Sequence, residues 1–430
     1  MRITFAPLLA VLAAAAPLGV AAQDATGLRT SLPPDDAAVA EAYPNAPRRT
    51  IAPEDDPYAP LGIRVGRYIL YSSLTSTLGH TSNADGVAGG KGAGYGMLAP
   101  ELRLESDWDR HAATLTLRGE YEQYFDGSDA SPTAEIAAMR RIDFADRWTA
   151  DLAAGYRFEQ QDTTDPDFPA GADSPPGIHD LNASAAISGG AGRATFTAEV
   201  SADRQMFEDA SSGGVPIDQG DRTSTLVSAR LRAGYEATAT LTPFVEGVVS
   251  RRLYDRAVDN DGLRRSSTGL AWRAGIAFDR DPILSGEVAV GAAQEIFDDA
   301  ALATLRTLTF DGSLTWAPTP LTTVKLDGTT AFNPSADVAS AGSVIHEVTV
   351  NVDYAWRRNV TLNANAGFVR EAYEGTGVVD TTTSAGFGAT WKVNRTMHLT
   401  AGYLHEWADS TDPTGRFQSD AVQVELRLQR

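Results

Sequence analysis

The sequence has no cysteine, and this absence excludes disulfides, thiolate metal sites and a cysteine nucleophile. After the first 22 residues it also lacks any apolar run near ~18 residues, the length that a membrane-spanning helix needs. Positive charge is scarce: 36 basic residues face 56 acidic ones, and the formal net charge is −20. This balance argues against nucleic acid as a partner.

Catalytic motifs are missing as well. His346-Glu347 and His405-Glu406 begin like zinc-protease motifs, but neither has a second histidine four residues later. No G-x-S-x-G nucleophile elbow occurs. The glycine-rich segment Gly89–Gly94 lacks the spacing of a phosphate-binding loop. We therefore expect no enzyme activity, no cofactor, no catalytic residue and no metal site.

Acidic clusters are the one feature of the sequence that could form a metal-binding site. They lie at Asp126–Asp129, Asp162–Asp167 and Asp255–Asp261. Carboxylates in such loops can bind Ca²⁺. Solvated acidic loops are the commoner case.

The first residues have the composition of a secretory signal peptide, assigned to residues 1–22. Arg2 supplies the positive end, Ile3 to Val20 is almost wholly apolar, and small residues close the segment at Ala22. A membrane helix is the alternative, but Pro7 and Pro17 interrupt the stretch. We expect the mature chain to begin near Gln23.

Residues 23–66 form a different segment, rich in proline and aspartate and without strand alternation. This composition predicts a mostly irregular periplasmic lead-in. Whether it or a loop plugs the space enclosed by the following domain is left open.

From residue 67 to residue 430, segments of about ten residues alternate apolar and polar side chains, as in Ala113–Tyr121. Successive side chains of a strand point to opposite faces, so each segment has one apolar and one polar face. A water-soluble β-sandwich shares this pattern. The regular alternation of short and long connections favours an all-β, closed, antiparallel, up-and-down transmembrane β-barrel.

The pattern predicts eighteen strands, and sixteen if the weak segments near Ala138 and Ala185 are misread. The expected centres are Leu74, Leu102, Leu117, Ala138, Ala154, Ala185, Ala198, Leu231, Val248, Ala274, Val290, Phe310, Leu326, Val350, Ala364, Phe387, Ala401 and Leu426. Eight short and nine long connections join them. Bacterial barrels have even strand numbers, short periplasmic turns and long extracellular loops, so both ends of the barrel domain should be periplasmic.

Aromatic residues support this orientation. Five tryptophans adjoin short turns and should form a periplasmic aromatic girdle: Trp108, Trp148, Trp316, Trp356 and Trp391. Other aromatic residues adjoin the long loops. Two aromatic belts are expected at the two membrane interfaces.

The polar face of the strands is highly charged and should line an aqueous lumen, since eighteen strands enclose more space than side chains can fill. On three consecutive strands it carries Arg230, Arg232, Glu246, Arg252 and Arg273. One interpretation is a charged constriction that favours anions. The other is a salt-bridged wall that stiffens the barrel, with Glu246 as a partner of the arginines.

The segment Glu54–Tyr71 contains D-P-Y-A-P-L-G-I-R-V-G, which leads into the first strand. It resembles the outer-membrane barrels of alphaproteobacteria known as the putative beta-barrel porin 2 family, over about residues 50–430. The resemblance implies an outer-membrane barrel without catalytic residues. Some family members are thought to accompany exopolysaccharide machinery.

Together these features predict a porin-like channel for hydrophilic solutes, with a link to exopolysaccharide export as an implication of the resemblance. The alternative is a non-conducting barrel that acts as an anchor, a display protein or an embedded hydrolase. The expected partners are outer-membrane lipid or lipopolysaccharide, the barrel-assembly machinery, and a polysaccharide or small solutes. Monomer and trimer are both consistent with the sequence.

Overall fold

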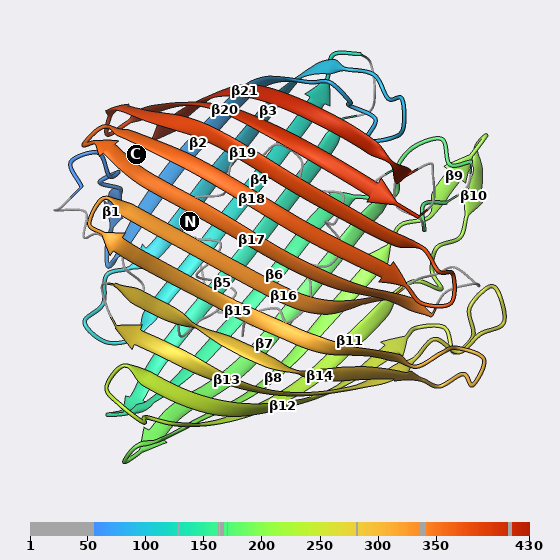
Figure 1. Cartoon of the computed structure of the whole chain (residues 1–430), viewed down its shortest axis with the longest axis horizontal. Helices are drawn as coiled ribbons and strands as arrows, with labels where there is room; N and C mark the ends of the chain where they lie inside the picture. The colour runs from blue at the N-terminus through green and yellow to red at the C-terminus, as the bar shows by residue number, and fades with distance from the viewer. Residues whose placement is uncertain are drawn as a thin grey trace, which may run out of the picture.

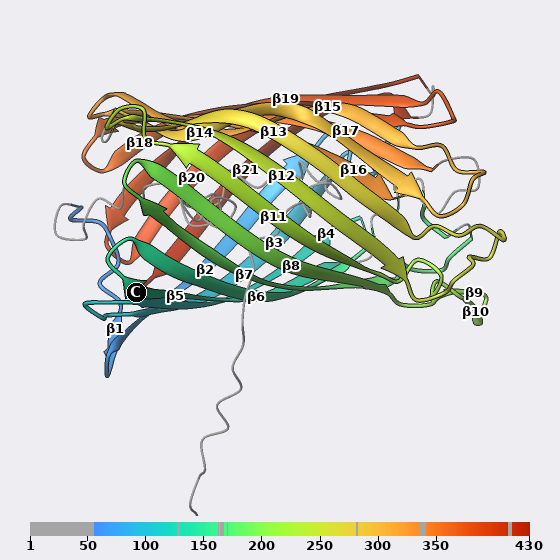
Figure 2. The same ribbon diagram turned by 90° about the horizontal axis from the view of Figure 1, so that it is seen from below.

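The structure is a computed structural model that describes residues 56–430, except 127–129, 162, 164–166, 170, 281–282, 335–340 and 412–414. The predicted signal peptide and most of the lead-in therefore lie outside the described residues. The described chain forms a closed antiparallel barrel of 18 strands (Figures 1 and 2). No helix in this part of the chain is long and apolar enough to cross a membrane.

The barrel strands follow one another in chain order. They are β2 (Tyr68–Thr81), β3 (Ala93–Ser106), β4 (Ala112–Tyr124), β5 (Ser131–Ala145), β6 (Trp148–Gln160), β7 (Gly177–Ala191), β8 (Ala194–Phe207), β11 (Ser224–Tyr235), β12 (Leu241–Tyr254), β13 (Ser267–Arg280), β14 (Leu284–Phe297), β15 (Leu305–Thr319), β16 (Thr322–Pro334), β17 (Gly342–Arg357), β18 (Val360–Tyr373), β19 (Val379–Asn394), β20 (Met397–Ser410) and β21 (Phe417–Gln429). Each predicted centre lies within one of them. The count of eighteen is confirmed and the alternative of sixteen is wrong, because β5 and β7 are full strands.

The two ends of the barrel differ as the connection lengths predict. The turns at one end are short, for example between β5 and β6 and between β7 and β8. The long loops, including that between β8 and β11, gather at the other end, where Figures 1 and 2 show β9 and β10. The C-terminus lies at the short-turn end in both views.

Pairing between β2 and β21 closes the barrel. Its register runs from Ser73 opposite Gln429 to Thr81 opposite Ala421. Next to the first of these rungs, the backbones of Ser72 and Arg430 exchange two hydrogen bonds of 2.9 and 3.2 Å. Closure gives each of the eighteen strands a partner strand on both sides, as a barrel in lipid requires.

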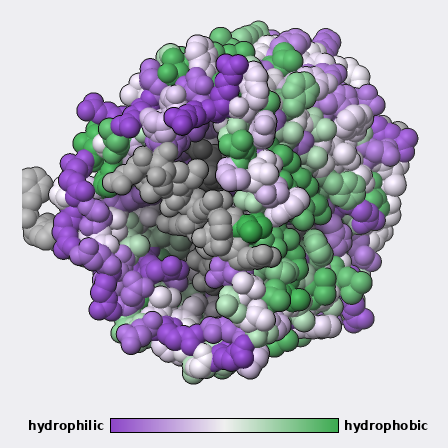
Figure 3. Space-filling model, turned by 60° about the vertical axis from the view of Figure 1, so that its left-hand side comes forward, coloured by the Kyte–Doolittle hydropathy of each residue, from purple (hydrophilic) through white to green (hydrophobic). Residues whose placement is uncertain are grey.

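The two faces of the wall follow the period of two in the sequence. Leu231, Val424 and Leu308 point outward and expose between 50 and 78% of their surface. Their neighbours Arg230, Arg232 and Gln423 point into the barrel. Figure 3 shows hydrophobic side chains gathered on the side wall and hydrophilic ones around the rim of the short-turn end. The assignment of an apolar outer face and a polar lumen face is therefore confirmed.

A short strand outside the barrel count holds the start of the described chain. β1 (Ile63–Val65) pairs with the beginning of β2 through a tight turn at Gly66-Arg67. Gly66 has φ +64°, as the first central position of a type II′ hairpin turn requires. This hairpin places the preceding residues against the short-turn end.

Residues 56–58 bind the turn between β19 and β20. A carboxylate oxygen of Asp56 lies 3.0 Å from Lys392 Nζ, and Arg395 donates to the carbonyl of Pro57 at 2.7 Å. Asp56 also accepts the backbone N–H of Tyr58 at 2.8 Å. The D-P-Y segment is therefore an anchor for the lead-in.

A hairpin in the longest described loop region was not predicted. β9 (Ala210–Ser212) and β10 (Val215–Ile217) pair within the connection from β8 to β11, around Gly213-Gly214, which both have positive φ. Arg222 ties this connection to the neighbouring loop: it donates to Gln161 at 3.2 Å and to the carbonyl of Asp167 at 3.1 Å. The outer loops are therefore bound to one another.

Candidate functional site in the barrel lumen

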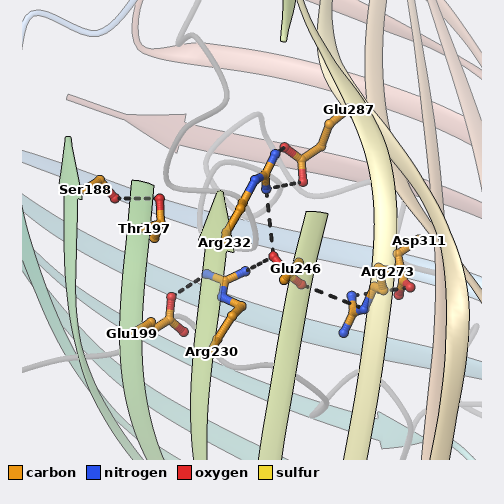
Figure 4. Close-up of polar contacts among 9 residues, drawn as sticks. All are labelled: Ser188, Thr197, Glu199, Arg230, Arg232, Glu246, Arg273, Glu287 and Asp311. Carbon is orange, nitrogen blue, oxygen red and sulfur yellow. Dashed lines mark hydrogen bonds and ion pairs between the residues drawn. The ribbon is translucent and has the colours of Figure 1, made fainter. Parts of the chain in front are cut away.

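The charged residues singled out from the sequence meet on the lumen wall formed by β8, β11, β12 and β13 (Figure 4). Arg230 on β11 lies directly opposite Glu199 on β8, and Arg232 lies opposite Glu246 on β12. Glu246 in turn lies opposite Arg273 on β13. The register of adjacent strands thus alternates acid and base around the wall.

Glu246 is the hub of this cluster. Its carboxylate lies 3.6 Å from Arg230, 4.0 Å from Arg232 and 3.8 Å from Arg273. The side chain is only 4% exposed. Burying a carboxylate is expensive unless cations surround it, and three guanidinium groups surround this one.

Each of the three arginines also binds a second acid. Arg230 hydrogen bonds to Glu199, and Arg273 lies 3.3 Å from Asp311. Arg232 forms a two-pronged pair with Glu287 at 2.6 and 2.9 Å, the geometry that suits guanidinium and carboxylate best.

Arg232 is further fixed by an aromatic ring. Its guanidinium carbon lies 3.4 Å from the centre of the Phe244 ring, which is 5% exposed. Such stacking restricts the side chain and adds cation–π attraction. The cluster is therefore rigid on this side.

Arg252, the fourth predicted arginine, lies apart from this hub. It is 3.6 Å from Glu295, which also accepts a hydrogen bond from Ser267 at 2.5 Å. The structure thus brings Arg230, Arg232, Glu246 and Arg273 together and places Arg252 in a separate pair.

Three further acids balance the positive charge of the arginines on this wall. Glu199, Glu287 and Asp311 belong to the cluster and were not singled out with Glu246, although they lie on the predicted lumen face. Strand register was the signal for Glu199, which is the direct neighbour of Arg230. Every arginine of the set contacts an acid, which fits the salt-bridged wall, and the anion preference stays a prediction.

A second polar region lies on β17, β18 and β19. Asn365 lies opposite Asn351 on one side and Gly386 on the other, and Asn363 lies between Asp353 and Gly388. The two glycines leave room for the amides, since a Cβ at Gly386 would come within 2.3 Å of Asn365 Oδ1. The Oδ1 atoms of Asn363 and Asn365 are buried and lack a hydrogen-bond partner among the described residues. Buried amide oxygens of this kind call for water or a ligand.

A tyrosine of β3 lies across β2 on the lumen face and reaches β21. Tyr95 is 1% exposed and donates a 2.8 Å hydrogen bond to Gln423 of β21. Its ring covers Gly79, where a Cβ would clash at 2.3 Å. This residue bridges the closing strands from the inside.

The five tryptophans of the predicted girdle all lie near the short turns. Trp316, Trp356 and Trp391 are between 48 and 54% exposed on the outer face. Trp148 packs over Gly189 of the neighbouring strand, and Trp108 makes an edge contact with Tyr68, with ring centres 5.5 Å apart. Their position fits an interfacial belt.

The acidic loops bind arginine where they are described. Asp259 lies 2.6 Å from Arg265, and both side chains are almost fully buried in the loop after β12. Burial raises the pKa of Asp259, but backbone N–H groups and Arg265 outweigh it and hold that pKa below its usual range. Among the residues that the structure describes, no group of three or more His, Asp or Glu side chains is placed to hold a metal ion. Most of the Asp126–Asp129 and Asp162–Asp167 segments lies outside the described residues.

A closed antiparallel barrel with an apolar outer face, a charged inner face and unequal ends defines the class of outer-membrane β-barrels. The particular family follows from the sequence: the chain belongs to the family described as Putative beta-barrel porin 2, whose model matches residues 56–430. No curated protein matches the sequence.

Several solved barrels are similar in shape and distant in sequence. The copper transporter OprC is 9% identical, with 86% of this chain and 82% of that chain covered and a TM-score of 0.48. A mutant of the ferric enterobactin receptor PfeA from Pseudomonas aeruginosa is 6% identical, with 84 and 80% covered and a TM-score of 0.42. The iron transporter FrpB from Neisseria meningitidis is 10% identical, with 80 and 64% covered and a TM-score of 0.43.

Proposed function

We propose that the protein is an outer-membrane channel for small hydrophilic solutes, with the short turns and Arg430 on the periplasmic side. The observation that carries this proposal is the lumen wall. Glu246, its arginines and the asparagines of β18 face inward, and a dry interior would make so many polar groups expensive. A hydrated lumen through 18 strands allows small solutes to pass.

The class of solute follows from the same wall. Paired charges give the lumen both signs, and the asparagines of β18 add uncharged amides, a side-chain type that hydrogen bonds to hydroxyl groups. These features favour neutral, hydroxyl-rich molecules such as sugars over ions of one sign. They are also the observation that favours the link to exopolysaccharide export.

Single-channel recording tests this proposal. The refolded protein, inserted into a planar bilayer with KCl on both sides, should show stepwise conductance. A folded and inserted barrel without conductance would overturn the channel and leave the anchor, the display protein or the embedded hydrolase.

Selectivity is tested on the same preparation in a salt gradient. Replacing Arg230, Arg232, Arg252 and Arg273 with Gln should move the reversal potential toward cation preference, because their acids remain. An unchanged reversal potential with unchanged circular dichroism would show that the arginines serve only the wall.

A further inference from the structure

The backbone pairing between β15 and β16 is incomplete, and we call this stretch of the wall the seam. The ladder joins Gly312–Trp316 to Val324–Gly328, and Thr319 pairs with Thr322. In the outer half, residues 305–311 and 329–334 are described but have no paired residue across this seam. Both strands stay paired on their other edges, β15 from Leu305 to Trp316 with β14, and β16 from Thr322 to Pro334 with β17.

Side chains replace the missing rungs. The hydroxyl of Thr330 accepts the N–H of Phe310 at 3.1 Å and donates to its carbonyl at 3.2 Å. His346 on β17 lies 3.2 Å from that hydroxyl through Nδ1 and 3.4 Å from Thr307 through Nε2. A few side-chain hydrogen bonds thus hold a stretch that a backbone ladder holds elsewhere.

This seam lies at the depth of the apolar band. Leu308 beside it points outward and is 78% exposed, and Phe310 is 44% exposed. The Phe310 ring covers Gly328, at the last complete rung opposite Gly312. Unpaired backbone groups in hydrocarbon cost several kcal/mol each, so this is a weak line in the wall.

The inner face behind the seam carries an apolar patch, set between the buried acids Asp311 and Glu371. Ile345 and Val369 are 2 and 4% exposed and pack with Ala331. Leu305, at the outer end of β15, is 1% exposed.

We propose that β15 and β16 part in their outer half and form a lateral passage between the lumen and the outer leaflet, for molecules that carry an acyl chain. The last rung pairs Gly312 with Gly328. Neither residue has a side chain that would hold the two strands together, so this rung serves as the hinge. Thr330 and His346 act as the latch. This function goes beyond the axial channel, which passes hydrophilic solutes only.

Hydrogen exchange of the unmodified protein in lipid nanodiscs tests the opening itself. Amides of residues 305–311 and 329–334 that face the seam should exchange at least ten times faster than amides between β17 and β18 at the same height. Equal exchange in the two regions would overturn the proposal.

Labelling from the membrane tests the passage. A single cysteine at Ile345, behind the seam, should react with pyrene maleimide dissolved in phosphatidylcholine vesicles at least ten times faster than one at Ser384. Ser384 is the matched control, because it is 4% exposed and lies behind the continuous β18–β19 ladder. A water-soluble maleimide should label both alike.

A disulfide across the seam completes the test. In a chain without native cysteine, Phe310→Cys with Thr330→Cys should abolish the excess labelling at Ile345→Cys when oxidised and restore it when reduced. Labelling that the disulfide leaves unchanged would overturn the passage. Conductance of the same preparation separates the two proposals: rapid labelling without conductance overturns only the axial channel, and conductance with equal labelling overturns only the lateral passage.

Discussion

Glu246 contacts three arginines, and each of them also contacts another acid. Removing one partner of an isolated buried ion pair costs about 3–5 kcal/mol, because the other charge stays buried and unpaired. Here the arginines keep Glu199, Glu287 and Asp311, so the loss should be smaller.

We predict that Glu246→Gln lowers the free energy of unfolding by about 1–3 kcal/mol and moves the reversal potential toward anions. Urea unfolding in detergent and salt-gradient recordings measure the two effects. Glu101→Gln is the control, since Glu101 lies 3.8 Å from Arg118 and is 25% exposed. Equal effects of the two variants would contradict the role of Glu246 as the hub.

Neighbouring positions on β17 provide a test of the two faces. Val350 points to lipid, and Thr349 points into the lumen between Asp327 and Gly367. We expect Val350→Arg to cost about 2–4 kcal/mol and Thr349→Arg to cost less than about 1 kcal/mol, because only the first arginine enters hydrocarbon. Equal unfolding midpoints would show that the face assignment fails there.

At the scale of the element, the anchoring of residues 56–58 depends on pH. Burial raises the pKa of Asp56, but the N–H of Tyr58 and the ammonium of Lys392 outweigh it and hold that pKa below its usual value. A lowered pKa in the bound state means that anchoring is complete above the ordinary aspartate pKa of about 4 and is lost as the pH falls through the lower value.

We therefore predict that a fluorophore on Ala59→Cys loses anisotropy below about pH 4 and at every pH in the Asp56→Asn variant. Fluorescence anisotropy of the labelled protein in detergent measures this directly. Asp85→Asn, in the loop after β2, should leave it unchanged. An anisotropy that stays constant with pH in the parent protein would contradict the anchor.

Strand existence could be predicted because period-two alternation is a local property of each segment. Leu231 with Arg230 and Arg232 already marks the two faces of β11. Other features arise between elements. The pairing of Arg232 with Glu287 reaches across two intervening strands, β12 and β13. The missing rungs above Gly312 depend on how β15 and β16 twist apart. The β9–β10 hairpin was missed because its two strands are too short to show alternation.

At the scale of the whole molecule, the wall is continuous only when β21 pairs with β2 and β20. We predict that deletion of residues 417–430 abolishes the compact barrel, because two strands then expose unpaired backbone to lipid. Deletion of residues 23–55 should leave it intact. Heat-dependent mobility in denaturing gels distinguishes folded from unfolded barrel in both variants, and a folded product of the first deletion would contradict closure through β21.

The pairing of β2 with β21 also constrains the order of folding. Thr81 and Ser419 share a 2.8 Å hydrogen bond across a separation of 338 residues. During synthesis, nearly the whole chain must be made before the β21 partner of β2 exists. An unpaired strand edge is a template for the wrong neighbour, so the risk of misassembly grows with the lifetime of that intermediate.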